Sequence, residues 1–262
     1  MPRLGNSELN IIIILSFIHS FCLSTFLFIL NISSLNYGIS DSSYMMNTSW
    51  YYQYPNGNIE TRIYTDKYFV VSIYNIKDKN FVSTKGGIYS ADNGYYEVLE
   101  FNSLDSSSVG DTIFYSDFDI DIDDEIYVAT GIRIDKIEFS ANYPDHANPL
   151  NGSWLMSGIE RRGEMRMRDV NRPRKTLKML AGGRFQWIAY DTSKKGFYGT
   201  GGGTFTAVDG KYIENIEFFS RDSNTVGKSL DFDYEIKEGD WHHKGFSSKG
   251  DPKYEIWTKR KQ

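Results

Sequence analysis

Residues 230–236 read Leu-Asp-Phe-Asp-Tyr-Glu-Ile, so that apolar and acidic side chains alternate without a break. Side chains of a β-strand point alternately to its two faces, and this stretch therefore predicts a strand with one buried and one hydrated face. Glu238, Gly239 and Asp240 follow as a turn signal and lead into a second strand at 241–246. Together they predict an antiparallel hairpin near the C-terminus.

The same alternation extends through the C-terminal half of the chain. It recurs at 183–190 and 253–260, and Asp209 and Gly210 mark a tight turn between two further strands. An aromatic content of 16% fits this pattern, because aromatic side chains favour pleated, half-buried strands. We count about eight strands in this half and no long segment with a helical period. Antiparallel strands in sequence order suggest an up-and-down barrel, whose closure removes exposed edges.

An internal repeat relates the two halves of the chain. Residues of the same type recur at an offset of 116 and, after one inserted residue, of 117. The matched pairs include Phe69 and Phe185, Tyr74 and Tyr190, Phe81 and Phe197, Thr84 and Thr200, Gly86 and Gly202, Gly87 and Gly203, Tyr95 and Tyr212, Glu97 and Glu214, and Glu100 and Glu217. Each unit is long enough to bury a core of its own. We therefore predict two domains, at 47–146 and 147–262, after a leader at 1–34 and a polar linker at 35–46.

The leader contains a hydrophobic stretch of 22 residues at 11–32, without Asp, Glu, Lys or Arg. A helix of about 20 apolar residues crosses a bilayer. Two interpretations remain open: a signal peptide cleaved after a small residue such as Ser24 or Ser34, or an uncleaved membrane anchor. Both predict that the remainder of the chain is extracytoplasmic, either secreted or held at the membrane as part of the cell envelope.

Two features of the second unit point to a known family. Gly152, Ser153 and Trp154 open the unit and Arg260 closes it. Lipocalins have a Gly-x-Trp on their first strand and an Arg near the last strand that stacks on this Trp, a favourable cation–π arrangement. With the strand order, these residues make the second unit resemble the lipocalin-like domains of exported bacterial proteins. In the first unit Trp50 lacks the preceding Gly, and Tyr143 stands at the position of Arg260.

The resemblance implies an all-β chain of two tandem lipocalin-like antiparallel β-barrels of about eight strands each, preceded by an N-terminal hydrophobic helix. Gly152, Trp154 and Arg260 would form the structural closure of the second barrel. Glycines inside a strand favour bulges or barrel corners. The run at 201–203 is interpreted in this way, because it lacks the Lys-Ser/Thr of a phosphate-binding loop.

Bulk properties argue against several functions. The net charge of -5 gives no reason to expect nucleic-acid binding. The single cysteine, Cys22, lies in the leader, so the rest of the chain has no disulfide or Cys-ligated metal site. We find no nucleophile–base pattern and therefore expect no enzyme, no catalytic residue, no metal and no cofactor.

The candidate ligand-binding residues lie on the predicted inner face of the second barrel. They are Trp187, Tyr212, Glu214, Phe232, Tyr234 and His243. His242 and His243 are neighbours on a strand and must point to opposite faces. Glu214 and Glu217, like Glu97 and Glu100, also face opposite ways, and one of each pair is expected inside in a polar network with Tyr or Arg.

An arginine-rich segment at 161–175 separates the first two strands of the second unit. Lys178 follows Trp154 by 24 positions, whereas Arg62 follows Trp50 by 12. Loops at a barrel mouth commonly carry function, and a basic lip could attract an anionic ligand. A simply solvated charge run is the preferred interpretation of this segment.

Three hypotheses follow. The first is an extracytoplasmic binding protein that holds a small, hydrophobic ligand in the barrel. The second is a structural or protein-interaction module of the cell envelope with filled barrels. The third, an enzyme that uses His242 or His243 with a Glu, has the weakest support. The resemblance alone names no ligand, and the sequence predicts no oligomeric state.

Overall fold

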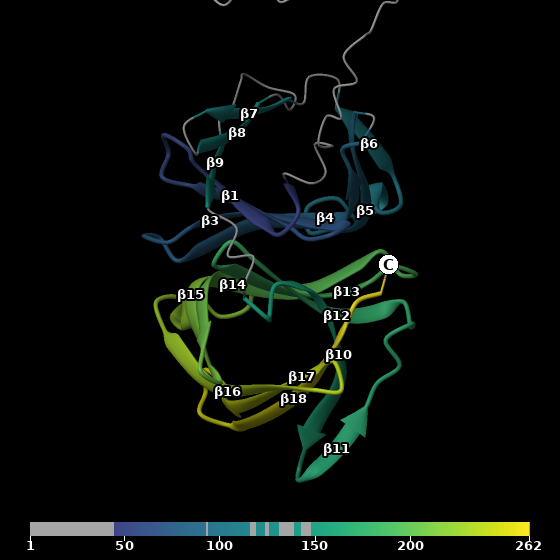
Figure 1. The fold of residues 1–262 in the computed structure, drawn as a ribbon, viewed down its shortest axis with the longest axis vertical. Helices are drawn as coiled ribbons and strands as arrows, with labels where there is room; N and C mark the ends of the chain where they lie inside the picture. The colour runs from purple at the N-terminus through teal and green to yellow at the C-terminus, as the bar shows by residue number, and fades with distance from the viewer. Residues whose placement is uncertain are drawn as a thin grey trace, which may run out of the picture. The chain divides into compact units, whose positions relative to one another are not determined.

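A computed structural model describes residues 45–92, 94–115, 119–123, 126–130, 139–142 and 148–261, with the backbone alone at 119–142. The predicted leader lies outside these ranges. No helix within them is both long and apolar enough to cross a bilayer. Both sheets of the structure belong to one compact unit, residues 39–262 (Figure 1).

The second sheet closes into an eight-stranded antiparallel barrel. Its strands are β10 (Gly152–Arg161), β12 (Arg174–Ala181), β13 (Arg184–Asp191), β14 (Gly196–Val208), β15 (Lys211–Phe219), β16 (Ser229–Lys237), β17 (Asp240–Phe246) and β18 (Pro252–Lys259). Each strand pairs with the next in this order, and β10 also pairs with β18 to close the ring. The short β11 (Glu164–Met167) pairs only with β10 and extends the sheet as an exposed hairpin (Figure 1). The all-β fold and this barrel are confirmed.

The first sheet has nine described strands. They are β1 (Thr48–Gln53), β2 (Ile59–Tyr64), β3 (Tyr68–Asn75), β4 (Asn80–Ser90), β5 (Tyr95–Asn102), β6 (Thr112–Tyr115), β7 (Asp119–Asp123), β8 (Ile126–Thr130) and β9 (Phe139–Asn142). The sheet order runs from β6 back to β1 and continues through β9 and β8 to β7. Among the described strands, the end strands β6 and β7 do not pair. An eight-stranded closed barrel, expected here too, is thus replaced by a nine-stranded sheet. At the offset of 117, β16 corresponds to residues 112–120, where β6 and the start of β7 lie.

Positions related by the sequence offset have the same strand pairing. Phe69 pairs with Gly87 in the first sheet, and Phe185 pairs with Gly203 in the second. A register shift precedes Gly87 on β4 and Gly203 on β14. A Cβ at either glycine would overlap a carbonyl oxygen of the neighbouring strand. These glycines therefore mark bulges, as their place within strands predicts.

The opening tryptophans also have equivalent partners. Trp50 pairs with Arg62, and Trp154 pairs with Lys178. The longer connection of the second sheet was expected to be a loop. It instead contains the β10–β11 hairpin, because residues 158–161 pair with residues 164–167. The arginine-rich segment is thus partly a strand at the barrel rim.

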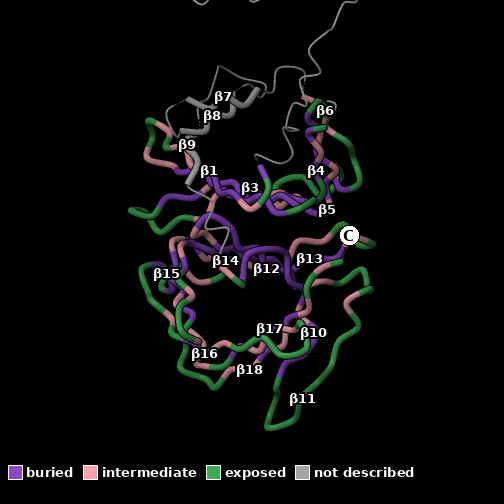
Figure 2. The backbone as a smooth tube through the Cα atoms, viewed as in Figure 1, coloured by how far each residue is buried: buried purple, intermediate pink, exposed green. Residues whose placement is uncertain are grey.

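The apolar core is divided among the sheets and the layer between them. One cluster lies inside the second barrel and includes Trp154, Phe185, Tyr212, Phe232 and Trp241. Another joins side chains of β2, β3 and β5 to side chains of β10, β12 and β13. Most residues of β3, β12 and β13 are accordingly buried, whereas β11 is exposed (Figure 2). Burial of apolar surface at this layer stabilises the contact of the two sheets.

Candidate functional site

One end of the closed barrel is hollow. A cavity of about 380 Å³ opens there, lined by residues from β10, β12, β13, β15, β16 and β18. Its apolar wall includes Ile159, Trp187, Ile216, Phe219, Leu230 and Trp257. Trp187 and Phe219 meet edge to face with ring centroids 5.3 Å apart. The cavity therefore combines aromatic walls with an opening to solvent.

Arginines surround the mouth of this cavity. Arg161, Arg168, Arg174 and Arg221 line it, and all four are exposed. Two of them are held by Tyr198: the Arg174 guanidinium lies 3.5 Å from the centroid of its ring, and Arg221 Nε donates to its carbonyl oxygen at 2.7 Å. The segment that supplies Arg161 and Arg168 is the insertion of the second unit.

A buried ion pair forms the floor of the cavity. Lys178 on β12 donates from Nζ to Glu214 Oε1 on β15 at 2.7 Å, and their side chains are 2% and 5% exposed. Burial opposes ionisation of Glu214, but the charge of Lys178, the hydrogen bond from Lys178 and the other basic groups nearby together lower the pKa of the carboxyl group. Burial of Lys178 lowers the pKa of its amine. The pair is stabilised by mutual attraction, without which each charge would be costly inside a barrel.

A second buried pair lies beside the floor. His243 Nδ1 is 3.3 Å from Glu255 Oε2, which also lies 3.2 Å from Lys253 Nζ. Burial, reinforced by the charge of Lys178, lowers the pKa of His243 to about 4. Burial disfavours the charged form of Glu255, yet Lys253 and His243 hold its pKa well below the usual range. At neutral pH His243 is therefore neutral and Glu255 is ionised.

The other half of the barrel is filled with side chains. Tyr212, Phe232, Trp241 and His243 pack there, and the rings of Phe232 and His243 are 4.0 Å apart between centroids. The barrel is thus neither fully hollow nor fully packed.

The predicted ligand-binding residues divide between these two halves. Trp187 and Glu214 line the cavity. Tyr212, Phe232 and His243 are buried in the filled half, and Tyr234 packs half-buried against the same apolar cluster. His242, on the opposite face of β17, bonds through Nδ1 to the Tyr254 hydroxyl at 2.8 Å.

The cation beside Trp154 in the second barrel is not the residue that the resemblance implies. The Trp154 indole is buried and donates to the Leu150 carbonyl oxygen at 2.8 Å. Lys259, not Arg260, places its ammonium near this ring, 5.2 Å from the centroid. Because consecutive residues of a strand point to opposite faces, Arg260 turns outward and lies 3.8 Å over the ring of Tyr68. Gly152, with φ 128, brings its backbone against the Lys259 side chain.

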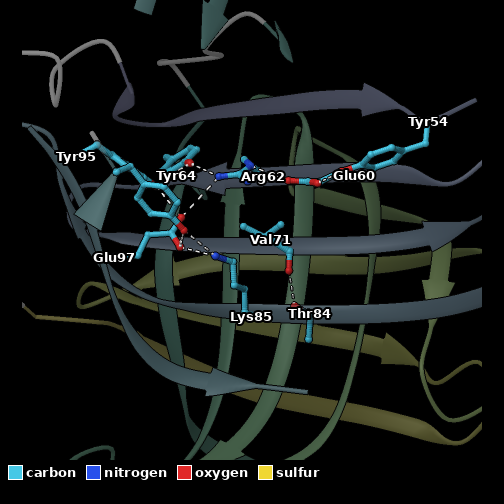
Figure 3. Close-up of polar contacts among 10 residues, drawn as sticks. Tyr54, Glu60, Arg62, Tyr64, Val71, Thr84, Lys85, Tyr95 and Glu97 are labelled. Carbon is cyan, nitrogen blue, oxygen red and sulfur yellow. Dashed lines mark hydrogen bonds and ion pairs between the residues drawn. The ribbon is translucent and has the colours of Figure 1, made fainter. Parts of the chain in front are cut away.

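The first sheet contains a related polar network on the equivalent positions (Figure 3). Glu97, like Glu214, is buried, and it accepts hydrogen bonds from Tyr95 at 3.0 Å and from Lys85 at 2.6 Å. Arg62, at the position of Lys178, lies 3.6 Å from Glu97 and donates from Nε to Glu60 at 2.9 Å. The inward glutamate with Tyr and Arg partners is therefore present, as the alternation predicts.

The outward glutamates make reciprocal contacts across the layer between the sheets. Tyr74 donates to Glu217 at 2.5 Å, and the equivalent Tyr190 donates to Glu100 at 2.6 Å. Each carboxylate also binds an arginine: Arg184 donates to Glu217 at 2.8 Å, and Arg260 donates to Glu100 at 3.0 Å. The two Tyr–Glu contacts are reciprocal, as in a two-fold dimer interface, whereas both arginines belong to the second unit.

Several residues that line the cavity are absent from the predicted site, among them Lys178, Phe219, Arg221 and Lys253. The match of Lys178 with Arg62 in the repeat is the one signal in the sequence for an inward cation at this position. Phe219 has no repeat signal, since Asn102 stands at its position in the first unit, whereas Lys253 matches Lys136 at the offset of 117. That both line the cavity depends on how the barrel closes.

Comparison with known proteins covers the closed barrel. Residues 149–262 match the model of a family described as "Domain of unknown function (DUF4488)". This range contains all the strands of the barrel and the whole cavity. No curated protein matches the chain.

Proposed function

We propose that this protein is an extracytoplasmic, non-enzymatic binding protein whose second barrel holds one small, largely apolar molecule. The cavity beside Trp187 carries the proposal. Small-molecule sites are concave, mostly apolar and about 300–1,000 Å³ in volume, and the cavity of about 380 Å³ falls in this range. It is already formed, because its strands belong to a closed barrel.

The proposal includes a lipocalin-like relationship for both units. It is supported by the order of the strands in the closed barrel and by the buried Trp154 with a cation near its ring. Shared bulges at Gly87 and Gly203 support a tandem pair. The first unit has no counterpart of the arginine-bearing insertion, so we assign binding to the second barrel.

The extracytoplasmic location rests on the hydrophobic stretch at 11–32. As a signal peptide or as an anchor, this stretch would direct the remainder of the chain across the membrane.

A binding rather than a catalytic role is supported by the pairing of ionisable groups at the floor. Lys178 is bonded to Glu214, and Glu255 is shared by His243 and Lys253. General acid–base catalysis needs a group within reach of substrate and with a pKa near the working pH. His243 has a pKa of about 4 and is fully buried below the cavity.

Native mass spectrometry of the exported full chain tests the proposal. We expect a small-molecule adduct that is released on denaturation. The Ala189→Phe variant should lose it, because Ala189 lines the cavity and a phenyl ring would fill the space. The control variant Val208→Phe introduces the same side chain at an exposed position and should retain the adduct. Circular dichroism would establish that both variants are folded.

A bare mass for the wild type, unchanged after incubation with a panel of lipids and apolar molecules, would contradict the proposal. That result would favour a structural or protein-interaction module instead.

A further inference from the structure

The charges around the cavity do not balance. Six cationic side chains line it, against two carboxylates, Glu214 and Glu255. Lys178 is paired with Glu214 and Lys253 with Glu255. The cations that remain are Arg161, Arg168, Arg174 and Arg221. In the part of the chain that the structure describes, none of these four arginines forms an ion pair.

Two of these arginines are held in position without losing their charge. Arg174 stacks on the ring of Tyr198, which leaves the edge of its guanidinium group free to donate. Arg221 donates to the carbonyl oxygen of the same residue. A side chain at Gly199 would overlap the Arg221 guanidinium, so the glycine gives this arginine its space. The mouth is thus pre-organised, which lowers the entropic cost of binding an anion.

The remaining arginines crowd one another. Partial burial lowers the pKa of Arg168, and the charges of Arg161 and Arg174 lower it further, against an opposing effect of Glu255. Nearby like charges repel, and an anion among them would remove this repulsion. Guanidinium groups bind carboxylate and phosphate oxygens through two parallel hydrogen bonds. A singly charged head group would leave most of this positive charge uncompensated.

We propose that the ligand is an amphipathic molecule with a dianionic head of the phosphate-monoester class. Arg161, Arg168 and Arg174 bind the head at the mouth, and the apolar body lies against the rings of Trp187 and Phe219, which line the cavity together. The Lys178–Glu214 pair limits how deeply the apolar body enters the barrel. Its two groups already bind each other, and charged groups are unfavourable neighbours for an alkyl chain. This inference rests on the proposed binding function of the second barrel and names the ligand class for the same site.

The site belongs to the second barrel alone. Arg161 and Arg168 lie on the inserted segment that begins with the β10–β11 hairpin. The first unit shares only the interior cation, because Arg62 stands at the position of Lys178. It has no inserted segment between Trp50 and Arg62. The inserted segment therefore adds an anion-selective mouth to the second barrel, which the first unit lacks.

Calorimetric titration of the full chain tests the head group with four probes: octyl phosphate, octyl sulfate, octanol and inorganic phosphate. At pH 7 the phosphate monoester carries nearly two negative charges and the sulfate one. We expect octyl phosphate to bind about tenfold more tightly than octyl sulfate, and octanol more weakly than both. Lowering the pH below about 6 should reduce the affinity for octyl phosphate towards that for octyl sulfate, because the phosphate loses its second negative charge.

Variants locate the head group. Arg168→Gln and Arg174→Gln should each weaken octyl phosphate binding by about tenfold and leave octanol binding unchanged. Arg166→Gln is the matched control: Arg166 lies on β11 but does not line the cavity, and its variant should bind all probes as the wild type does.

Other outcomes overturn the inference in distinguishable ways. Equal affinity for all three octyl compounds, abolished by Ala189→Phe, would overturn the dianionic head while the binding function stands. Inorganic phosphate that binds as tightly as octyl phosphate would overturn the amphipathic ligand in favour of a free phosphate. Absence of binding by all four probes would overturn the inference, and an adduct in native mass spectrometry would then show that the binding function survives.

Discussion

Lys178 Nζ lies 2.7 Å from Glu214 Oε1 inside the closed barrel, with both side chains almost fully buried. The matching residues of the first sheet, Arg62 and Glu97, lie 3.6 Å apart. Each sheet therefore contains a cation and a carboxylate on two strands that are not neighbours. Removal of a charge from water costs several kcal/mol, so Lys178 and Glu214 each depend on the other inside the barrel. Arg62 and Glu97 have additional partners in Glu60 and Lys85.

Substitution of one partner of the floor pair should be costly. Lys178→Met leaves Glu214 buried and unpaired, and we expect a loss of about 3–5 kcal/mol in the free energy of unfolding. The double variant Lys178→Met with Glu214→Gln should be more stable than the sum of the single effects predicts, by about 1–3 kcal/mol. Urea denaturation of the four proteins measures this coupling. Additive effects would contradict a paired floor.

An exposed ion pair provides the control for that experiment. Lys211 and Asp233 are 2.7 Å apart on the outside of the barrel and are 58% and 70% exposed. Lys211→Met should leave the unfolding transition unchanged, because solvent screens exposed pairs.

The buried His243 should make stability depend on pH. Its pKa is about 4 in the folded protein, against 6.5 for the ordinary group. The unfolded chain therefore binds an additional proton between these values, and stability falls as the pH is lowered from 6.5 towards 4. The full effect is roughly 3 kcal/mol, at 1.36 kcal/mol per pH unit.

The His243→Gln variant, which cannot titrate, should lose this part of the pH dependence. The titratable groups near His243 include Lys178 on β12, Tyr212 and Glu214 on β15, and Lys253 and Glu255 on β18. Equal slopes for wild type and variant between pH 6.5 and 4 would show that His243 is not buried in its neutral form.

The glycine bulges should not tolerate a methyl group. A Cβ at Gly203 would overlap the carbonyl oxygen of Asn215, which is part of the sheet backbone and cannot move alone. We expect Gly203→Ala to destabilise the protein by about 1–3 kcal/mol. At Gly196 a Cβ would meet only the flexible end of Tyr198, so Gly196→Ala should have a smaller effect on the melting temperature. Equal melting temperatures for the two variants would be inconsistent with a bulge at Gly203.

The stability of the contact between the two sheets should depend on Arg260. This side chain binds Glu100 and stacks on Tyr68, which belong to the first sheet. Arg260→Met leaves the Glu100 carboxylate with Tyr190 alone, and we expect a loss of about 2–5 kcal/mol in unfolding free energy. Lys259→Met removes a neighbouring charge that is exposed and should cost less. The reverse order of the two effects would contradict the assigned contacts.

The sequence predicts those parts of the fold that depend on local patterns. Alternation at 230–236 identifies β16, and the turn at Gly239 identifies its hairpin with β17. Glycines repeated at the same offset predict both bulges. Strict alternation also predicts that one glutamate of each pair faces inward, because two residues three apart on a strand point to opposite faces. The structure buries Glu97 and Glu214.

Features that depend on closure or on the partner sheet could not be predicted. The charge run at 161–168 has no strong apolar alternation, and only its pairing with β10 makes part of it a strand. The resemblance assigns Arg260 to Trp154, but the neighbouring Lys259 has the correct strand parity for that ring. The division of the interior into a cavity and a filled half depends on side-chain packing, which a single strand pattern does not contain.

The most direct measurement of the central claim is the indole N–H spectrum of the ¹⁵N-labelled protein during titration with octyl phosphate. Trp187 lines the cavity, whereas Trp154 and Trp241 lie in the filled half and Trp50 belongs to the first sheet. Trp187→Phe assigns the relevant resonance. A saturable shift of the Trp187 resonance, with those of Trp50, Trp154 and Trp241 unmoved, is the predicted result. An unmoved Trp187 resonance at saturation, or a shift confined to Trp50, would contradict ligand binding in the second barrel.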